Sequence, residues 1–114
     1  MTPEQKKNRA AQKRRWRERN PERNAREKRG RAYRRRYGIT IEDYERILIE
    51  QGGVCAICSI PPSPNGHRLH VDHDHTTGAV RALLCQRCNT AISYFEGPMR
   101  QAYIGYLARY KTPI

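Results

Sequence analysis

The alternation of apolar and polar positions divides the chain into two parts. In residues 1–36 apolar side chains are few, and most of them are alanines, with Trp16 and Tyr33 as the large ones. Thr2 before Pro3 is a typical helix start, and Asn20-Pro21 is expected to end one helix and begin another. We predict two polar helices here, neither of which buries enough apolar surface to be stable by propensity alone.

Beyond residue 37 the apolar positions recur at regular spacing. Thr40 and Asp43 form a capping-box-like start for a helix that Gly52-Gly53 ends, and its apolar face is expected to contain Ile41, Tyr44, Ile47 and Leu48. A loop rich in Pro, Gly, Ser and Asn follows over residues 59–68. The helix carries no residues typical of catalysis, so we interpret it as part of the core.

The second half of the chain predicts a β-hairpin and two helices. "LHVDHDH" (69–75) and "AVRALLC" (79–85) read as short strands joined by "TTGA". "QRCNTAISYFEG" predicts a helix ended by Gly97, and Pro98 opens a last helix. An apolar stripe on that helix is interpreted as core: Met99, Ala102, Tyr103, Tyr106, Leu107 and Tyr110. The order of elements predicts a small α+β fold built round a hairpin and a helix.

Charge separates the same two parts. Residues 1–36 contain 16 Lys and Arg against 4 Glu, whereas residues 37–114 contain 7 basic and 7 acidic residues, so the whole net charge of +12 lies in the first part. We therefore predict a basic helical arm (1–36) and a globular domain (37–114). The arm should bind a polyanion, with DNA preferred over a membrane surface because no Leu/Phe/Trp face is present. Its candidate DNA contacts are Arg14, Arg15, Arg17, Arg34, Arg35 and Arg36.

Two alternatives remain open for the arm: a solvated, partly disordered tail in the absence of nucleic acid, and an ordered basic arm in its presence. The sequence has no apolar run long enough to span a membrane and no signal-peptide segment, so we expect a cytoplasmic protein with no membrane partner. In a reducing compartment four cysteines are more typical of metal binding than of disulfides.

The cysteines form two Cys-x-x-Cys pairs, Cys55/Cys58 and Cys85/Cys88. Two such pairs supply the four thiolates of a tetrahedral Zn²⁺ site. Because four protein ligands leave no open coordination position, we expect one structural zinc per chain. Metal binding would also stabilise a domain with a small apolar core.

A second cluster lies between the cysteine pairs. Asp72, His73, Asp74 and His75 follow one another, with His67 and His70 nearby and Asn89 just after Cys88. A carboxylate and an amide oxygen suit Mg²⁺, and a neutral imidazole suits a general base, which predicts Asp72 and Asn89 as ligands and His73 as base. The alternative is that these histidines and aspartates are simply solvent-exposed polar residues of a strand, or that they form a weak adventitious metal site.

The geometry of a strand bears on this cluster. Strict alternation places Asp72 and His73 on opposite faces. Both can serve one phosphate if the strand bends between them, or if the metal and the base approach from different sides.

The stretch "CAIC…LHVDHDHTTGAVRALLCQRCNTA" closely resembles the recombination endonuclease VII family of phage nucleases, within the HNH or His-Me finger superfamily. The resemblance covers roughly residues 37–95. It implies a zinc-stapled ββα-metal core flanked by helices, and hydrolysis that leaves 5′-phosphate and 3′-hydroxyl ends. It also implies Mg²⁺ on Asp72 and Asn89, His73 as general base and His75 as an auxiliary phosphate-binding or orienting residue.

The sequence therefore predicts a metal-dependent DNA endonuclease, encoded by a phage and active in the host cytoplasm, that nicks duplex DNA or cleaves branched DNA. Mn²⁺ is expected to substitute for Mg²⁺. Arg81 and Arg87 flank the site as candidate phosphate contacts, with solvated surface arginines as the alternative reading. A homodimer is left open. The alternative function is a non-catalytic zinc-ribbon module that binds DNA through the arm.

Overall fold

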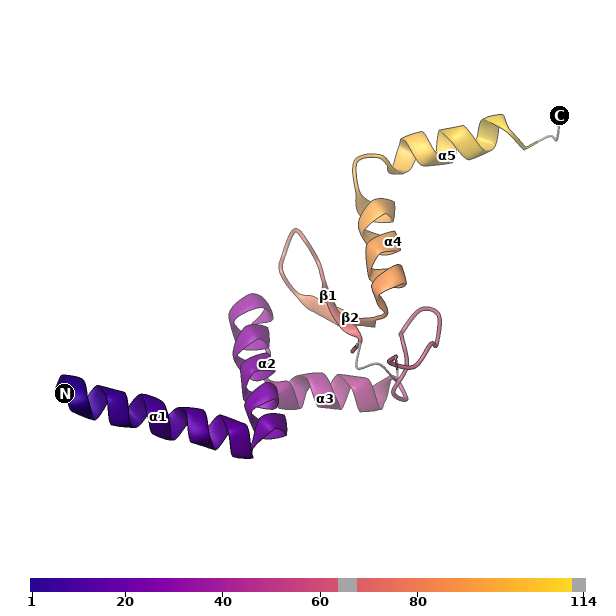
Figure 1. Cartoon of the computed structure of the whole chain (residues 1–114). Helices are drawn as coiled ribbons and strands as arrows, with labels where there is room; N and C mark the ends of the chain where they lie inside the picture. Colours follow the sequence, from indigo (N-terminus) through magenta and orange to yellow (C-terminus); the bar gives the residue numbers. More distant parts are fainter. Residues whose placement is uncertain (64–67, 112–114) are drawn as a thin grey trace. The chain divides into compact units, whose positions relative to one another are not determined.

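The computed structural model describes residues 1–63 and 68–111. In this part the elements are α1 (Pro3–Arg19), α2 (Pro21–Tyr37), α3 (Ile41–Glu50), β1 (His70–His73), β2 (Val80–Leu84), α4 (Gln86–Glu96) and α5 (Arg100–Arg109) (Figure 1). Contacts divide the chain into two compact units, Met1–Glu45 and Arg46–Ile114, so that the division falls within α3. None of the described helices combines the length and the apolar character needed to cross a membrane.

The first unit begins with the two predicted helices. Thr2 Oγ1 accepts a hydrogen bond from the Gln5 N–H at 3.1 Å, and Gln5 Oε1 accepts one from the Thr2 N–H at 2.9 Å, which completes a capping box. At the other end of α1 the backbone and side-chain amides of Asn20 both donate to Trp16 O, and Pro21 opens α2. Both helices are confirmed, and over these described residues neither buries a side chain.

The core of the first unit lies where α2 meets the first part of α3. The rings of Tyr33 and Tyr44 stack with their centroids 5.0 Å apart and an angle of 18° between their planes. Tyr44 and Ile41 are buried, as the apolar face of the predicted helix requires. Arg26 donates to Glu45 Oε1 from Nε at 3.1 Å and from Nη2 at 2.9 Å. Within this unit α2 thus meets the start of α3 through the Tyr33–Tyr44 pair, the buried Ile41 and the exposed ion pairs of Arg26 with Glu45 and Glu42.

Both ends of α3 follow the sequence prediction. Thr40 and Asp43 exchange hydrogen bonds between side chain and backbone at 2.9 and 3.1 Å. After Glu50, Gly52 and Gly53 adopt φ angles of 70° and 76°, in the left-handed region that glycine enters without steric cost.

The second unit is built on the antiparallel pair β1–β2. His70 faces Leu84 and Asp72 faces Ala82, but His73 faces Val80, so the register shifts between Asp72 and His73. The shift leaves Arg81 as the extra residue on β2, which is the arrangement of a β-bulge. Both strands are shorter than the sequence predicts. β1 covers 70–73 where 69–75 is predicted, and β2 covers 80–84 where 79–85 is predicted.

The hairpin turn accounts for the early end of β1. Asp74 Oδ1 accepts hydrogen bonds from the N–H groups of Thr76 at 2.7 Å and Thr77 at 3.0 Å. A side chain that bonds the backbone two and three residues ahead favours a turn over a continued strand. The pKa of Asp74 is held below its ordinary value by these same N–H groups, that of Thr77 first.

The core of the second unit is small and lies against the hairpin. Its apolar members are Leu69, Val71, Leu83 and Leu84, together with Cys55 and Cys88. The Gln51 side chain hydrogen-bonds the backbone of Leu83 on the outer edge of β2. Gln51 Oε1 accepts from the Leu83 N–H at 2.8 Å, and Gln51 Nε2 donates to Leu83 O and Val54 O, both at 2.9 Å.

The two last helices behave differently from each other. α4 packs against both strands and runs to Glu96, with Gly97 after it as predicted. α5 starts at Arg100, two residues beyond Pro98, and within the described range it buries no residue. The prediction that its apolar stripe is core is wrong, because side chains such as Tyr106 and Leu107 are 56% and 68% exposed. Helical spacing places apolar residues on one side of a helix, but their burial requires another element that packs against that side.

Candidate functional site

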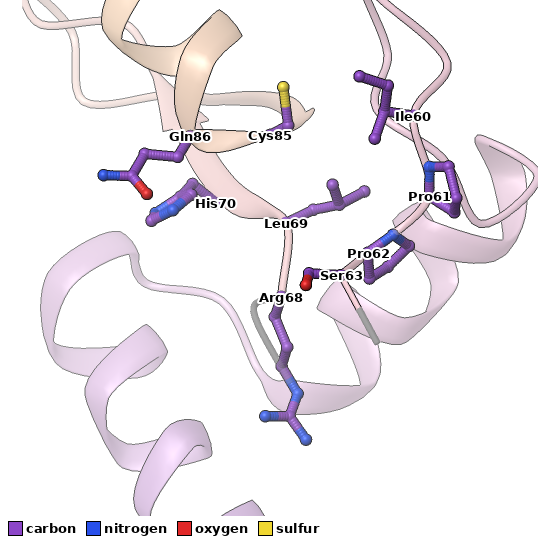
Figure 2. Close-up of a pocket in the computed structure, with 9 residues that line it drawn as sticks. All are labelled: Ile60, Pro61, Pro62, Ser63, Arg68, Leu69, His70, Cys85 and Gln86. Atoms are coloured by element: carbon purple, nitrogen blue, oxygen red, sulfur yellow. The ribbon is translucent and has the colours of Figure 1, made fainter. Parts of the chain in front are cut away.

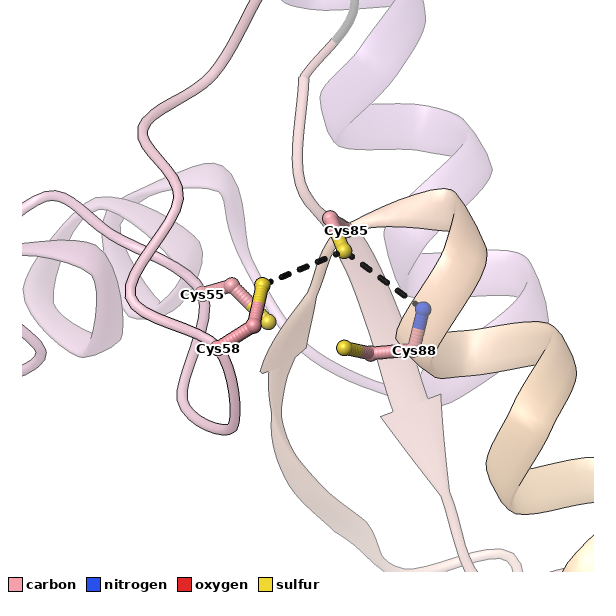
Figure 3. Close-up of side chains that lie close together, drawn as sticks. All are labelled: Cys55, Cys58, Cys85 and Cys88. Atoms are coloured by element: carbon pink, nitrogen blue, oxygen red, sulfur yellow. Dashed lines mark hydrogen bonds between the residues drawn. The ribbon is translucent and has the colours of Figure 1, made fainter.

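The four cysteines converge on one point between the loop after α3 and the start of α4 (Figure 3). Their sulfur atoms all lie within 4.8 Å of one another, and Cys58 Sγ is 3.7 Å from Cys85 Sγ. Cys85 is the N-cap of α4 and its sulfur accepts a hydrogen bond from the Cys88 N–H at 3.5 Å. The cluster therefore ties the loop to the junction of hairpin and helix.

This cluster has the chemistry of a metal site. Zn–S bonds of about 2.3 Å at tetrahedral angles place thiolate sulfurs about 3.8 Å apart, close to the Cys58–Cys85 separation. Burial raises the pKa of the Cys55 thiol, but N–H groups including those of Cys58 and Cys85 outweigh it and lower the pKa to about 6. Burial raises the pKa of Cys88 to about 12. Such opposed shifts are expected of thiols that cannot all ionise together without a cation.

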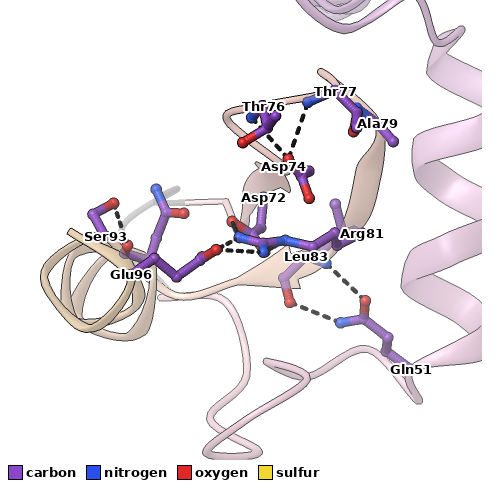
Figure 4. Close-up of polar contacts among 11 residues, drawn as sticks. Gln51, Asp72, Asp74, Thr76, Thr77, Ala79, Arg81, Leu83, Ser93 and Glu96 are labelled. Atoms are coloured by element: carbon purple, nitrogen blue, oxygen red, sulfur yellow. Dashed lines mark hydrogen bonds and ion pairs between the residues drawn. The ribbon is translucent and has the colours of Figure 1, made fainter. Parts of the chain in front are cut away.

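Asp72 holds the central position of the second cluster. It lies on β1, and its side chain is only 10% exposed. Arg81 on β2 meets it with two parallel hydrogen bonds, Nε to Oδ2 at 2.8 Å and Nη2 to Oδ1 at 3.0 Å (Figure 4). A buried carboxylate needs such a partner, because desolvation of an unpaired charge is costly.

The same guanidinium binds a second carboxylate. Arg81 Nη1 donates to Glu96 Oε2 at 3.0 Å, and Nη2 donates to Glu96 Oε1 at 2.6 Å. The hydrogen bonds that Arg81 donates to Glu96, and secondly those to Asp72, raise the pKa of Arg81, and the guanidinium in turn lowers the pKa of Glu96. Arg81, predicted as a phosphate contact, thus lies in a chain of three charges from β1 through β2 to the last residue of α4.

The histidines lie at the end of β1 and in the turn. The rings of His73 and His75 are 4.7 Å apart between centroids and tilted by 57°. His73 is half-buried and His75 is exposed. His70 is exposed at the start of β1, and His67 lies outside the described residues.

The bulge lies opposite the step from Asp72 to His73. The register shifts between these two residues because Arg81 is inserted on β2. A bulge bends the strand that carries the extra residue, which here is β2. Asp72 and His73 stay consecutive on β1, so whether they serve one phosphate from a common side stays a prediction.

Asn89 lies in the first turn of α4, and its N–H donates to Cys85 O at 2.9 Å. The backbone of Asn89 is therefore held in the turn of α4 that begins and ends with cysteines of the cluster, Cys85 and Cys88. Over the described residues no hydrogen bond joins Asn89 to Asp72, and the cysteines are the one set of His, Cys, Asp and Glu ligands that converges on a point. Any cation at Asp72 would rely on few protein ligands and on water.

A separate hollow of about 400 Å³ opens beside the cysteine cluster, lined mostly by Ile60, Pro61, Pro62 and Leu69, with Arg68 and His70 among its polar residues (Figure 2). Asp72, His73 and Asn89 are absent from its described lining. It is therefore distinct from the candidate catalytic cluster.

The predicted DNA contacts on the arm are all exposed: Arg14, Arg15, Arg17, Arg34, Arg35 and Arg36. Arg87, on the first turn of α4, is exposed as well. These positions leave the cationic groups accessible to a polyanion.

Sequence reasoning missed Glu96 and Gln51. Glu96 is 15 residues from Arg81 and Gln51 is 32 residues from Leu83, so no local spacing connects them. The weak signal for Glu96 was its place at the end of a helix predicted to pack on the hairpin.

Comparison with known proteins defines the class. Residues 30–109 match the family model of recombination endonuclease VII, so this chain belongs to that family. Among curated relatives, it is similar to the Gene 59 protein of Mycobacterium phage D29, with 55% identity over 58 residues, covering 49% of this chain and 33% of the relative. The Gene 59 protein of Mycobacterium phage L5 is 54% identical over 55 residues, covering 46% and 32%. The matched part is about a third of the length of these relatives.

Proposed function

We propose that this chain is a metal-dependent endonuclease of the HNH type that hydrolyses DNA phosphodiester bonds and leaves 5′-phosphate and 3′-hydroxyl ends. One observation supports the proposal: the hairpin that carries Asp72 and His73 packs against α4, the helix that bears Asn89, in a member of the endonuclease VII family. The phage relatives support a phage-encoded enzyme that acts in the host cytoplasm.

In this proposal each residue of the second cluster has a separate role in hydrolysis. His73 accepts the proton of the attacking water, because a neutral imidazole is an effective base near pH 7. Asp72 and Asn89 hold Mg²⁺ through a carboxylate and an amide oxygen, and Mn²⁺ can replace it. When bound, the cation stabilises the charge that develops on the phosphate and on the leaving oxygen. His75, next to His73, orients the phosphate.

The cysteine cluster holds one structural Zn²⁺ in this proposal. Four thiolates fill the coordination shell, so the zinc stabilises the fold and takes no part in hydrolysis. It fixes Asn89 relative to the hairpin because Cys85 ends the hairpin and Cys88 precedes Asn89. The His-Me finger core is the hairpin with α4.

The arm and the globular domain have separate tasks. The exposed arginines of α1 and α2, with Arg87 near the site, contact the phosphates of duplex or branched DNA, whereas Arg81, predicted as a further phosphate contact, donates to Asp72 and Glu96. Because the net charge of +12 lies in residues 1–36, the arm supplies most of the long-range attraction. Cleavage on one strand requires a single copy, and paired cuts across a branch would require a homodimer.

The test is cleavage of supercoiled, linear and four-way-junction DNA by the purified full chain, with Mg²⁺ or with EDTA. We expect nicked product with Mg²⁺ and none with EDTA. The alternative, a non-catalytic zinc-ribbon module that binds DNA through the arm, is favoured by the exposed basic helices. It predicts a stable complex in both conditions and no cleavage with Mg²⁺ or Mn²⁺.

A further inference from the structure

Both carboxylate oxygens of Asp72 are already occupied in the structure. Arg81 donates to Oδ1 and to Oδ2, with Asp72 nearly buried. Carboxylate oxygen is the right donor for a hard divalent cation. Each oxygen keeps a second lone pair, but a cation that binds Asp72 lies close to the positively charged guanidinium, and the repulsion between the two charges opposes their simultaneous contact with one carboxylate.

The structure also provides a second place for the guanidinium. Glu96 accepts from Nη1 and Nη2, whereas Asp72 accepts from Nε and Nη2, so only Nη2 is shared. Arg81 can leave Asp72 while its two-bond contact with Glu96 stays intact. The Glu96 side chain is 39% exposed, whereas that of Asp72 is 10% exposed.

The charges of the three groups favour this exchange. Two carboxylates and one guanidinium sum to a net charge of −1, and without Glu96 the pair would be neutral. A net negative cluster attracts a cation, and a guanidinium shared between two acceptors is less firmly held on either.

We propose that Arg81 holds the Asp72 carboxylate in place until a divalent cation binds, and that Glu96 is a positioning residue which receives the guanidinium when the cation takes Asp72. The inference rests on the proposed function, because it assumes that Asp72 is a cation ligand. No bond is made or broken in the exchange apart from hydrogen bonds and coordination.

The test measures Mn²⁺ binding to the full-length, zinc-loaded protein by electron paramagnetic resonance, with no DNA and no turnover. Among the described residues, Glu96→Gln leaves Arg81 hydrogen-bonded to one carboxylate, that of Asp72. Loss of one charge-assisted contact should raise the Kd for Mn²⁺ by about 10-fold. Glu50→Gln is the matched control, because it removes the same charge from another glutamate of the same unit that pairs with an arginine. Glu50 is exposed, and its Oε1 lies 3.7 Å from Arg46 Nε. This control should leave the Kd unchanged.

A double-mutant cycle separates this role from direct ligation. In an Arg81→Gln background no guanidinium competes for Asp72, so Mn²⁺ should bind at least as tightly as in the wild type and Glu96→Gln should have little further effect. If Glu96→Gln weakens binding equally in both backgrounds, Glu96 is itself a ligand and the proposal is overturned. It is also overturned if Glu96→Gln binds Mn²⁺ like the wild type.

Asp72→Asn tests the assumption independently. If Mn²⁺ binding survives this change, the assignment of the cation to Asp72 fails, and the inference fails with it. If Asp72→Asn abolishes binding but Glu96→Gln has no effect, the inference alone fails. Zinc content and the circular dichroism spectrum identify variants that fold. Should Arg81→Gln not fold, Arg81→Lys keeps the charge without the two-bond geometry and is expected to abolish most of the effect of Glu96→Gln.

Discussion

Gln51 offers the sharpest test of how the second unit is held together. Its side chain satisfies the outward N–H of Leu83, a residue with no exposed surface, and also donates to Leu83 O and Val54 O. In Gln51→Ala the Leu83 N–H loses its partner, whereas Leu83 O keeps the Ala56 N–H at 3.1 Å. One buried donor left without a partner costs about 1–3 kcal/mol.

A loss of about 2 kcal/mol corresponds to a melting temperature lowered by roughly 8–16 °C in a unit of this size. Thermal unfolding of the zinc-loaded protein, followed by circular dichroism, measures the change. Gln101→Ala on exposed α5 is the control and should melt like the wild type. Gln51→Glu should destabilise further, because a carboxylate then faces two carbonyl oxygens. If Gln51→Ala melts within about 2 °C of the wild type, Gln51 does not close the edge of β2.

Three other predictions concern the metal, the turn and the arm. Cys88→Ser should abolish stoichiometric zinc and cooperative unfolding, and a folded zinc-free variant would contradict the site. The pKa of Asp74 is lowered in the folded state, so its stabilisation is present above its unfolded pKa of about 3.9 and is lost as the pH falls through the folded value. The stability difference between wild type and Asp74→Asn, from urea titrations, should therefore shrink as the pH falls below about 4, and a constant difference would refute the charge effect. Replacing Arg14, Arg15 and Arg17 with Gln should flatten the slope of log K for DNA against log salt by up to about 2.7, and an unchanged slope would remove these residues from the interface.

The elements with local signals could be predicted from the sequence. Thr2 with Gln5, Asn20-Pro21 and the Cys-x-x-Cys pairs each act over a few residues, and the structure has the expected caps, helix break and cysteine cluster. The bulge at Arg81 could not be predicted. The order of apolar and polar residues in "AVRALLC" does not reveal whether every residue of β2 has a partner on β1. Nothing in the sequence indicates that the apolar stripe on α5 is exposed, since periodicity is a property of one helix and burial depends on another element.

The charge chain Asp72–Arg81–Glu96 is the clearest case of information that only the fold supplies. The sequence predicts a phosphate contact for Arg81 because the residue is basic and near the cluster. In the structure its donors go to two carboxylates, one of them on α4. The bulge and the packing of α4 determine which carboxylates Arg81 contacts, and neither feature produces a recognisable spacing of residues in the sequence.

The central claim is that His73 takes the proton from water in a metal-dependent cleavage of DNA. The most direct measurement is the single-turnover rate of plasmid nicking by His73→Ala, at saturating protein and Mg²⁺, compared with the wild type. The account predicts that the variant keeps its zinc and its affinity for DNA but cleaves about 10²–10⁴-fold more slowly. Cleavage by His73→Ala at the rate of the wild type would contradict it.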